Sequence, residues 1–377
     1  MWPGLPGFAK ETGMRPQQQQ RRKVAVVGAT GVAGQHFLVA LANHPWFELS
    51  TLAASERSAG RSYREALTGP GGALRWACDE PLPERFAAMP VIDARALDPR
   101  SVDLVFSAVE SDAARPLEEG LAPHVPVVST ASAFRYEDDV PIVVPGVNHE
   151  HCALVKRQQR ERGWRGFVLP IPNCTATGLV VALAPLVRSF GVRSVVMTSL
   201  QAISGAGRSP GVVALDILDN VIPFIPKEEE KVQRETAKIL GRLEGDRIAP
   251  LDVAVSATCT RVNVRDGHTL TVNAGLGKKA PLAAVADALR AFGREFTDLG
   301  LPSAPPELIQ LTEDPYRPQP RIDRHMHDGM TTVVGRLRED SVLPNGVKLV
   351  LVSHNTKMGA AKGATLVAEY LVHRGLV

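Results

Sequence analysis

The stretch KVAVVGATGVAG, residues 23–34, decides the fold of the N-terminal part of this chain. Its first five residues form a short, continuous run rich in valine, which is typical of a strand buried within a parallel sheet. A glycine-rich turn follows the run directly and precedes a stretch with helical spacing. A strand, a glycine turn and a helix in this order let backbone amides approach a pyrophosphate at the helix N-terminus. The stretch therefore predicts a dinucleotide site with contacts from Gly28, Ala29, Thr30, Gly31 and Val32.

The alternation of strand and helix continues to about residue 150. Apolar runs predict strands at residues 49–53, 102–108, 125–129 and 142–144, and helical spacing covers residues 35–43 and 113–122. Strands that alternate with helices form parallel sheets that are covered on both faces. We therefore expect an α/β fold, with a Rossmann-like doubly wound parallel sheet in residues 22–150.

The pattern changes after residue 150. Longer strand-like runs appear at 194–202, 253–264 and 268–274, with helical spacing at 175–190 and 282–292. We expect a second, α+β domain over residues 151–354 with a largely antiparallel sheet. The helical stretch 360–373, within residues 355–377, is expected to pack back onto the first domain and complete it. Residues 1–21 lack hydrophobic periodicity and predict a disordered tail.

Composition restricts the possible functions. The chain has 377 residues, of which 44% are hydrophobic and 22% charged, and its formal net charge is +3. No apolar run approaches the length that crosses a bilayer, so a membrane protein is not expected. Part of the small positive charge lies in residues 15–23, which argues against a broad nucleic-acid-binding face. We expect a small-molecule substrate instead.

The cysteine pattern indicates the redox compartment. The four cysteines are far apart and form no CxxC pair, and the chain shows no apolar signal peptide. This favours reduced thiols in the cytoplasm over a disulfide framework. Most cysteines of this kind are small buried apolar residues, and we keep that interpretation for Cys78, Cys152 and Cys259.

The fourth cysteine, Cys174, lies in the segment PIPNCTATG at residues 170–178, directly before a predicted helix. A thiol at a helix N-terminus meets the positive end of the helix dipole, which lowers its pKa. The resulting thiolate suits nucleophilic attack on an acyl carbon. Asn173 and nearby backbone amides are candidates to hold the oxyanion that the attack creates.

The residues after the second predicted strand indicate which dinucleotide binds. Ser55, Arg57 and Ser58 supply the hydroxyl and guanidinium donors that a 2′-phosphate requires. This arrangement favours NADP over NAD. The alternative is a solvated loop in which Glu56 binds the ribose hydroxyls of NAD.

The PNCT motif, in a chain that also carries GATGxxG, resembles the aspartate-semialdehyde dehydrogenases, and most closely their archaeal and fungal branch. The likeness extends from residue 23 to the C-terminus. It includes HPWFE at 44–48, residues 128–135, DVPIVVP at 139–145, SGAG at 204–207, NVIPF at 220–224, EEEK at 228–231 and DGHT at 266–269. So many matches in the same order are specific for one family.

The resemblance implies a reaction with a covalent intermediate. In that family a cysteine thiolate attacks aspartyl 4-phosphate, phosphate leaves, and NADPH reduces the thioester to aspartate 4-semialdehyde, a step in lysine, threonine, methionine and isoleucine biosynthesis. By this likeness Cys174 is the nucleophile, His268 of DGHT the acid-base residue, and Gln201 orients the reacting group. Gly205, within SGAG, is a further implied cofactor contact.

The resemblance also implies substrate contacts whose charges are chemically suitable. Arg261 matches the arginine that binds the α-carboxylate, and Glu228 would face the α-ammonium beside Asn173. Lys231 and Arg135 would bind the departing phosphate. An alternative is that Glu228 and Lys231 form an i, i+3 pair on an exposed helix face. The family further implies a homodimer or homotetramer.

Two positions depart from the family pattern and keep other functions open. Gly146 stands where an acidic residue is usual, and Thr260 stands where an asparagine is usual. They are compatible with a malonyl-CoA reductase that uses the same cysteine and NADPH. A regulator that binds the cofactor without chemistry would be expected to lack the cysteine or the histidine, and both are present.

Two histidine clusters are candidate metal sites. They are His149 with His151 and Cys152, and His325 with His327. A closed zinc site normally needs four ligands, and neither cluster suggests a third and fourth partner. We therefore expect no metal.

Overall fold

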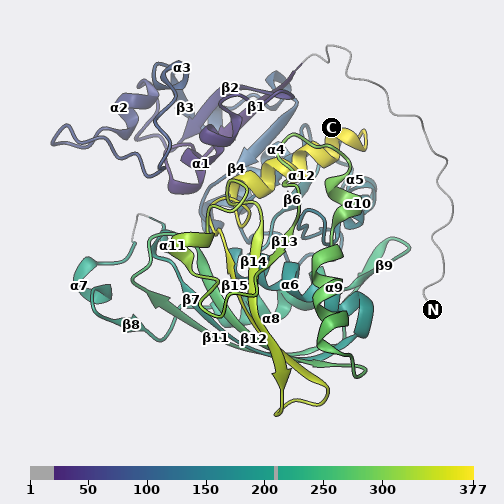
Figure 1. The fold of residues 1–377 in the computed structure, drawn as a ribbon. Helices are drawn as coiled ribbons and strands as arrows, with labels where there is room; N and C mark the ends of the chain where they lie inside the picture. Colours follow the sequence, from purple (N-terminus) through teal and green to yellow (C-terminus); the bar gives the residue numbers. More distant parts are fainter. Residues whose placement is uncertain (1–20, 208–210) are drawn as a thin grey trace.

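The computed structural model describes residues 21–207 and 211–377 (Figure 1). The predicted tail lies outside the described residues, apart from Arg21. The described chain contains a six-stranded sheet, a seven-stranded sheet and a two-stranded hairpin. The six-stranded sheet lies in the upper part of Figure 1 and the seven-stranded sheet in the lower part.

The six-stranded sheet is parallel throughout, in the order β3-β2-β1-β4-β5-β6. This is the order of a doubly wound dinucleotide-binding fold, which confirms the predicted fold class. Its strands are β1 (Arg22–Val27), β2 (Phe47–Ala54), β3 (Val91–Asp93), β4 (Leu104–Ser107), β5 (Val127–Ser129) and β6 (Val168–Pro170). β1 is an inner strand of this sheet, and its valine run is therefore buried on both faces.

The predicted strand at residues 142–144 is wrong. This segment is irregular, and a side chain satisfies its backbone: Val144 N–H donates to Asn148 Oδ1 (2.8 Å), and Asn148 Nδ2 donates to Ile142 O (2.8 Å). The residues are apolar because they are buried, and burial does not require pairing in a sheet. The sixth strand is β6 instead, so the sheet continues past the expected boundary at residue 150.

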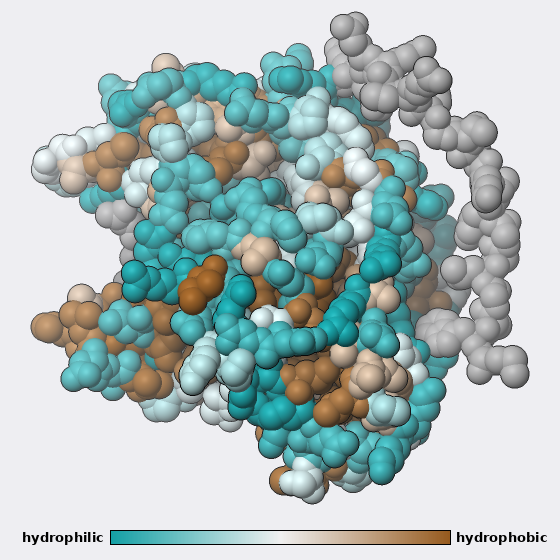
Figure 2. Space-filling view, in the orientation of Figure 1, coloured by the Kyte–Doolittle hydropathy of each residue, from teal (hydrophilic) through white to brown (hydrophobic). Residues whose placement is uncertain are grey.

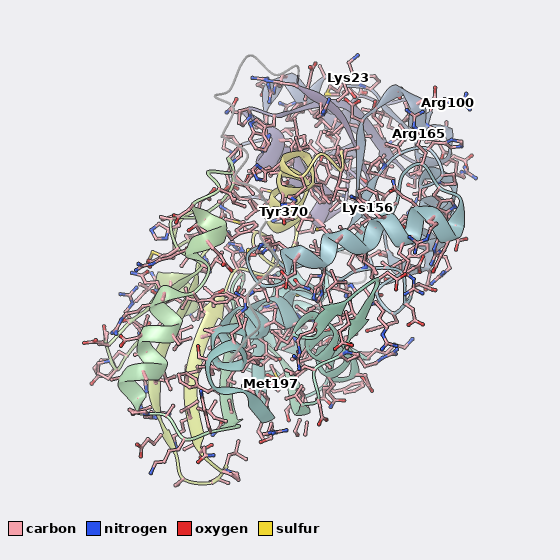
Figure 3. The ribbon with its side chains drawn as sticks, turned by 90° about the vertical axis from the view of Figure 1, so that its right-hand side faces the viewer. Lys23, Arg100, Lys156, Arg165, Met197 and Tyr370 are labelled. Atoms are coloured by element: carbon pink, nitrogen blue, oxygen red, sulfur yellow. The ribbon has the colours of Figure 1, made fainter. Side chains whose placement is uncertain are left out.

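The C-terminal helix α12 (Ala361–His373) packs on α1 (Val32–Leu41) and against β5, as predicted. A buried polar contact fastens the helix to the first domain. Glu369 accepts a hydrogen bond from His44 Nε2 (2.8 Å) and another from Ser303 N–H (2.9 Å). Tyr370 of this helix is labelled in Figure 3, and its ring lies 5.0 Å from that of His149.

The seven-stranded sheet has the order β13-β14-β15-β12-β7-β11-β8. It is antiparallel except where β7 pairs with β11 and β13 pairs with β14, in agreement with a largely antiparallel prediction. Its strands are β7 (Val192–Gln201), β8 (Val221–Ile222), β11 (Ala254–Val262), β12 (His268–Leu276), β13 (Ile309–Leu311), β14 (Thr332–Asp340) and β15 (Gly346–Ser353). Met197, labelled in Figure 3, is a buried residue of β7.

Three helices cover this sheet or join it to the first. They are α6 (Cys174–Phe190), α8 (Glu228–Ile239) and α9 (Leu282–Ala291). Helix α6 contacts β12, β15, β7 and β14, and residues 175–186 are buried, so it forms the apolar centre of the second domain. Helix α8 contacts both α6 and β11.

The remaining helices, apart from α4 with its 11 residues, have eight residues or fewer. The helices are α2 (Tyr63–Leu67), α3 (Glu84–Ala87), α4 (Ser111–Leu121), α5 (Val155–Arg162), α7 (Ala214–Ile217), α10 (Arg294–Thr297) and α11 (Pro320–Asp323). The 3₁₀ helices are η1 (Ala94–Ala96), η2 (Pro99–Ser101), η3 (His149–Leu154) and η4 (Ile203–Ala206), and the hairpin comprises β9 (Arg242–Glu244) and β10 (Arg247–Ala249). Among the described residues, no helix has both the length and the apolar character needed to cross a membrane.

Candidate active site

A cavity of about 610 Å³ brings together most of the residues singled out from the sequence. It is lined by the start of α1, the segments after β5 and β6, the end of β7, the start of α8 and the end of β11. The predicted residues among its lining are Val32, Arg135, Asn173, Cys174, Gln201, Gly205, Glu228, Lys231 and Arg261. Ligands of such folds bind beyond the carboxyl ends of the parallel strands, and this cavity has that position.

The local sequence places Cys174 at the first position of α6, as predicted. Asn173 is the N-cap of this helix, and its Oδ1 accepts hydrogen bonds from Thr175 N–H (2.9 Å) and Ala176 N–H (3.1 Å). Capping of this kind satisfies helix N–H groups that have no partner within the helix. The cap therefore fixes the first turn and, with it, the sulfur of Cys174.

His268 lies beside the sulfur, although the two residues are 94 positions apart in the sequence. The distance from Cys174 Sγ to His268 Nε2 is 3.2 Å. On the other side of the ring, Ala202 N–H donates to Nδ1 (3.1 Å). Nδ1 is thus an acceptor, so a neutral imidazole must carry its proton on Nε2, directed at the sulfur. Burial, reinforced by the charge of Arg261, lowers the pKa of His268 to about 3.

The expectation of a lowered thiol pKa is wrong for this pocket. Burial, followed by the charge of Glu228, raises the pKa of Cys174 to about 12, against the opposing effects of Arg261 and Arg135. A buried group loses the hydration that stabilises its charged form. The pair therefore rests as a thiol and a neutral imidazole at neutral pH.

Glu228 is buried and is the centre of a hydrogen-bond network. Its Oε1 accepts from Asn173 Nδ2 (2.9 Å), Gln201 Nε2 (3.0 Å) and Thr175 Oγ1 (3.2 Å). These contacts contradict the alternative of an exposed helix face with an i, i+3 ion pair. Lys231 also lines the cavity and forms no ion pair within residues 21–207 and 211–377.

The two predicted arginines are both buried against the cavity. Arg261 donates through Nη1 to Ala202 O (2.8 Å). Arg135 donates through Nη1 to Glu235 (2.9 Å) and through Nη2 to Thr130 O (2.9 Å). Its buried Nε has no hydrogen-bond partner among the described residues.

Two residues of the site were missed in the sequence. Glu235 lies behind Arg135 and Asn173, and its spacing of seven from Glu228 placed it on the same helix face. Asn355 lines the cavity, donates to Ser204 Oγ (2.8 Å) and accepts from Gly267 N–H (2.9 Å), next to His268. Nothing in the local sequence around Asn355 indicates this contact.

A second cavity, of about 710 Å³, adjoins the glycine turn and is lined by Gly28 and Ser55. Gly28 has φ +76°, and a Cβ there would lie 2.4 Å from Ala108 O, so only glycine fits. The carbonyl of Ala29 accepts from Tyr63 Oη (2.7 Å), and that of Thr30 accepts from Gln35 Nε2 (3.0 Å). Val32 lines the first cavity, so the turn and the start of α1 lie between the two cavities.

The predicted 2′-phosphate residues are only partly gathered here. Ser55 lines the second cavity, whereas Arg57 and Ser58 are not among its lining residues, and Arg57 is exposed. Glu56 is bonded to Arg95 (3.0 Å), a lining residue that sequence reasoning missed. Glu56 also lines this cavity, and the ion pair engages only its Oε2, so its alternative role as a ribose acceptor stays open.

The histidine clusters have other partners in the structure. His149 packs against Phe296, with 5.0 Å between the ring centroids, and His151 Nδ1 lies 3.0 Å from Asn148 Nδ2. His325 stacks obliquely on His354. The part of the chain that the structure describes contains no group of three or more His, Cys, Asp or Glu side chains suited to a metal ion.

Neither departure from the family pattern lines the catalytic cavity. Gly146 has φ +74°, and a Cβ there would lie 2.3 Å from Leu308 Cδ1. Thr260 donates to Ser199 O (2.8 Å) within the sheet. Both positions are therefore explained by local packing.

Comparisons with known proteins show the family to which the chain belongs. Residues 23–155 match the family model described as semialdehyde dehydrogenase, NAD binding domain, and residues 183–358 match semialdehyde dehydrogenase, dimerisation domain. Aspartate-semialdehyde dehydrogenase from Methanothermobacter thermautotrophicus is 43% identical over 348 residues, covering 92% of this chain and 98% of that protein. The enzyme of the same description from Saccharomyces cerevisiae is 42% identical over 94% of this chain and 99% of its own length.

Solved structures give the same result. Aspartate semialdehyde dehydrogenase with NADP from Candida albicans superimposes with a TM-score of 0.85 at 39% identity, covering 94% of this chain and all of that one (100%). Aspartate semialdehyde dehydrogenase II complexed with ASA from Vibrio cholerae gives a TM-score of 0.74 at 26% identity, covering 94% of this chain and 99% of that one.

Proposed function

This chain belongs to the aspartate-semialdehyde dehydrogenase family, and we propose that it reduces L-aspartyl 4-phosphate to L-aspartate 4-semialdehyde with NADPH. The observation that carries the proposal is the pair of Cys174 Sγ and His268 Nε2, 3.2 Å apart at the head of a helix beside a cavity of mixed charge. A nucleophile next to an acid-base group is the arrangement that acyl transfer requires.

The charges around the sulfur match the two ends of the substrate. Arg261 can present its guanidinium fork to the α-carboxylate, and Glu228 can accept from the α-ammonium. Lys231, whose ammonium has no ion-pair partner among the described residues, and Arg135 supply positive charge for the phosphate. Gln201 is held by Glu228 and can orient the reacting carbonyl.

In the first step the sulfur of Cys174 forms a bond to the acyl carbon, and phosphate leaves with the electron pair of the broken C–O bond. The thiol must give up its proton as it attacks, because burial keeps its pKa high in the resting site. The proton ends on the departing phosphate, which leaves as hydrogen phosphate, so that protons and charge balance. His268 directs Nε2 at the sulfur, where it stabilises the negative charge that develops on attack and again when the thioester carbon is released as aldehyde.

The residues around the glycine turn fit a dinucleotide. Gly28 has no side chain at a point where a Cβ would collide with Ala108 O. The turn and the start of α1 lie between the two cavities, so a bound dinucleotide could contact both. NADP would be held by the turn at Gly28 to Val32, by Gly205, and by Ser55 with Arg57 and Ser58 at the 2′-phosphate. When bound as NADPH, the cofactor supplies the hydride that reduces the thioester.

The proposal is tested by measuring phosphate-dependent NADP reduction with aspartate semialdehyde, beside NADPH oxidation with aspartyl phosphate or malonyl-CoA. We expect activity with the two aspartate compounds, and loss of at least about 10⁴-fold in Cys174→Ala with NADP binding retained. Preference for malonyl-CoA, or equal activity in Cys174→Ala, would overturn the proposal. Equal kcat/KM values with NAD and NADP would refute the cofactor assignment.

We further propose that the chain forms a homodimer through the outer face of the seven-stranded sheet. The family model that matches residues 183–358 is described as a dimerisation domain. On that face Val196, Ser256, Thr258 and Thr271 are exposed, neighbouring and uncharged. Sedimentation of Val196→Lys should show a smaller assembly than the parent protein, and an unchanged mass would contradict this interface.

A second exposed surface suits a further contact, as in a homotetramer. Apolar side chains gather over α7 and β8 in Figure 2, and those exposed are Val213, Leu215, Leu218, Val221 and Phe224. Leu215, at 86% exposure, is expected to matter only for assembly. Leu215→Asp should therefore reduce a tetramer to a dimer and leave a dimer unaffected.

The four free cysteines fit the reducing cytoplasm, where we place the protein.

A further inference from the structure

Glu235 is a fully buried carboxylate in the middle of α8. Its Oε1 accepts from Arg135 Nη1 (2.9 Å) and, at 3.4 Å, from Tyr136 Oη. Its Oε2 accepts from the backbone N–H of Asn173 (2.6 Å). A carboxylate without water is tolerated only when donors compensate for its lost hydration, and here all the donors belong to two segments of the catalytic cavity.

The first segment carries a cation that faces the cavity. The guanidinium of Arg135 is held at one end by Glu235 and at the other by Thr130 O (2.9 Å), so it has little freedom to rotate. Arg135 is 5% exposed and lines the cavity. Removing the carboxylate would leave a buried guanidinium with its orientation fixed at one end only.

The second segment carries the nucleophile. The backbone N–H of Asn173 donates to the other oxygen of Glu235, Oε2. The side chain of Asn173 caps the helix on which Cys174 is the first residue. A single carboxylate therefore joins the position of the sulfur to the position of the cation. The partners lie 100 and 62 residues from Glu235 in the sequence.

The rest of α8 reinforces this arrangement from the same face. Lys238, one turn beyond Glu235, donates through Nζ to Arg135 O (2.8 Å) and Glu137 O (2.8 Å). Glu228, two turns before it, accepts from Asn173 Nδ2. Helix α8 thus holds both the side chain and the backbone of Arg135, and both the side chain and the backbone of Asn173.

We infer that Glu235 is a positioning residue, which sets the distance between the sulfur of Cys174 and the cation at which the phosphate binds. The inference rests on the proposed function, because it assigns the phosphate to Arg135. Glu235 itself does not touch the reacting atoms. Its effect is expected on phosphate use and on turnover, and not on the dinucleotide.

The experiment measures phosphate-dependent NADP reduction with aspartate semialdehyde for the parent protein, Glu235→Gln, Glu235→Asp and Glu230→Gln. Glu230 is exposed on the same helix and serves as the matched control. Rates are divided by the concentration of folded protein, titrated by NADP binding, so that a misfolded fraction does not lower kcat. KM is determined separately for phosphate and for NADP.

In Glu235→Gln an amide N–H₂ must face either a backbone N–H or a guanidinium. We expect KM for phosphate to rise and kcat to fall by roughly tenfold each, the effect of one lost charge-assisted hydrogen bond, with KM for NADP unchanged. Glu235→Asp keeps the charge and should restore part of the phosphate KM. Glu230→Gln should match the parent protein.

The outcomes distinguish failure of the proposed function from failure of the positioning role of Glu235. If the parent protein shows no phosphate-dependent reduction, the proposed function fails. If the parent protein is active and Glu235→Gln keeps its KM for phosphate and its kcat per folded protein, the positioning role is refuted. A purely structural role would lower the amount of folded protein in Glu235→Gln and Glu235→Asp without changing either constant, and it would also refute the inference.

Discussion

Two opposing effects decide the ionisation of Cys174. A helix N-terminus favours a thiolate by about 0.3–1 kcal/mol, or roughly 2 kcal/mol in partly buried geometries. Since one pKa unit corresponds to about 1.4 kcal/mol, this effect lowers a pKa by less than about 2 units. Full burial can shift a pKa by up to 3–5 units. Cys174 is half-buried at the wall of the cavity, yet burial is still the larger effect here, and it raises the pKa of Cys174 to about 12.

This balance predicts how the free thiol reacts. Because only the thiolate is alkylated, the rate of Cys174 alkylation by iodoacetamide should rise about tenfold per pH unit from pH 7 to pH 9 without reaching a plateau. Cys174→Ala provides the background rate from the other three cysteines. A plateau near pH 7 would show that the sulfur is already ionised in the unliganded protein.

The charge of Arg261 gives a second prediction for a single residue. Replacing Arg261 by Leu removes the guanidinium fork proposed to hold the carboxylate of the substrate. KM for aspartate semialdehyde should rise by roughly 10- to 100-fold, since hydrogen bonds to charged groups contribute about 1.5–3 kcal/mol. KM for NADP serves as the control and should be unchanged. A selective loss of NADP binding would contradict the assignment.

At the scale of elements, α12 packs on α1 and against β5 from the far end of the chain. Glu369 Oε1 joins it to His44 Nε2 in the segment after α1, and Oε2 joins it to Ser303 N–H in the segment after α10. His44 Nδ1 accepts from Trp46 and Phe47 N–H groups (3.1 Å each), so Nε2 carries the proton that Glu369 accepts. Both donors, His44 and Ser303, are buried, so water cannot take the place of the carboxylate.

Glu369→Ala should therefore be strongly destabilising. It leaves two buried donors without partners, at about 1–3 kcal/mol each, so we expect the free energy of unfolding in urea to fall by roughly 2–5 kcal/mol. Glu295→Ala is the control, because its ion pair with Arg188 (3.3 Å) is at the surface and contributes less than about 1 kcal/mol. Equal effects of the two variants would contradict the role of the buried contact.

At the scale of the whole molecule, buried histidines make stability depend on pH. Burial lowers the pKa of His149 and of His151 to about 4 each. The unfolded chain takes up a proton near pH 6.5, whereas the folded protein resists it until about pH 4. The stabilisation is therefore complete above pH 6.5 and is lost as the pH falls towards 4.

Chemical unfolding at pH 7 and pH 5 checks this sign. Between about pH 6 and pH 4.5 each histidine should remove roughly 1.4 kcal/mol of stability per pH unit. His149→Phe keeps the ring that packs on Phe296 and should reduce the slope of the pH dependence by the share of one histidine, whereas the exposed His124→Gln should leave it unchanged. Stability that rises from pH 7 to pH 5 would contradict the argument.

Features defined by neighbouring residues were predictable from the sequence. The valine run and glycine turn of residues 23–34, the start of a helix at Cys174 and the helical spacing near the C-terminus depend on local spacing, burial pattern and capping. The pairing of Cys174 with His268 was reached through family resemblance, since 94 residues separate them. The same is true of Arg261 and Glu228 as parts of one cavity.

The tertiary structure alone decided which buried segments pair and how the site is charged. The three-residue strand β6 and the segment 142–144 are both apolar, but only β6 forms a ladder with a strand, whereas 142–144 has a single backbone hydrogen bond to Pro170. The pKa of Cys174 depends on how completely the folded chain encloses the sulfur, and Glu235 acquires its role from partners far away in the sequence. Desolvation and long-range contacts arise from the enclosure of residues distant in sequence, which local spacing does not record.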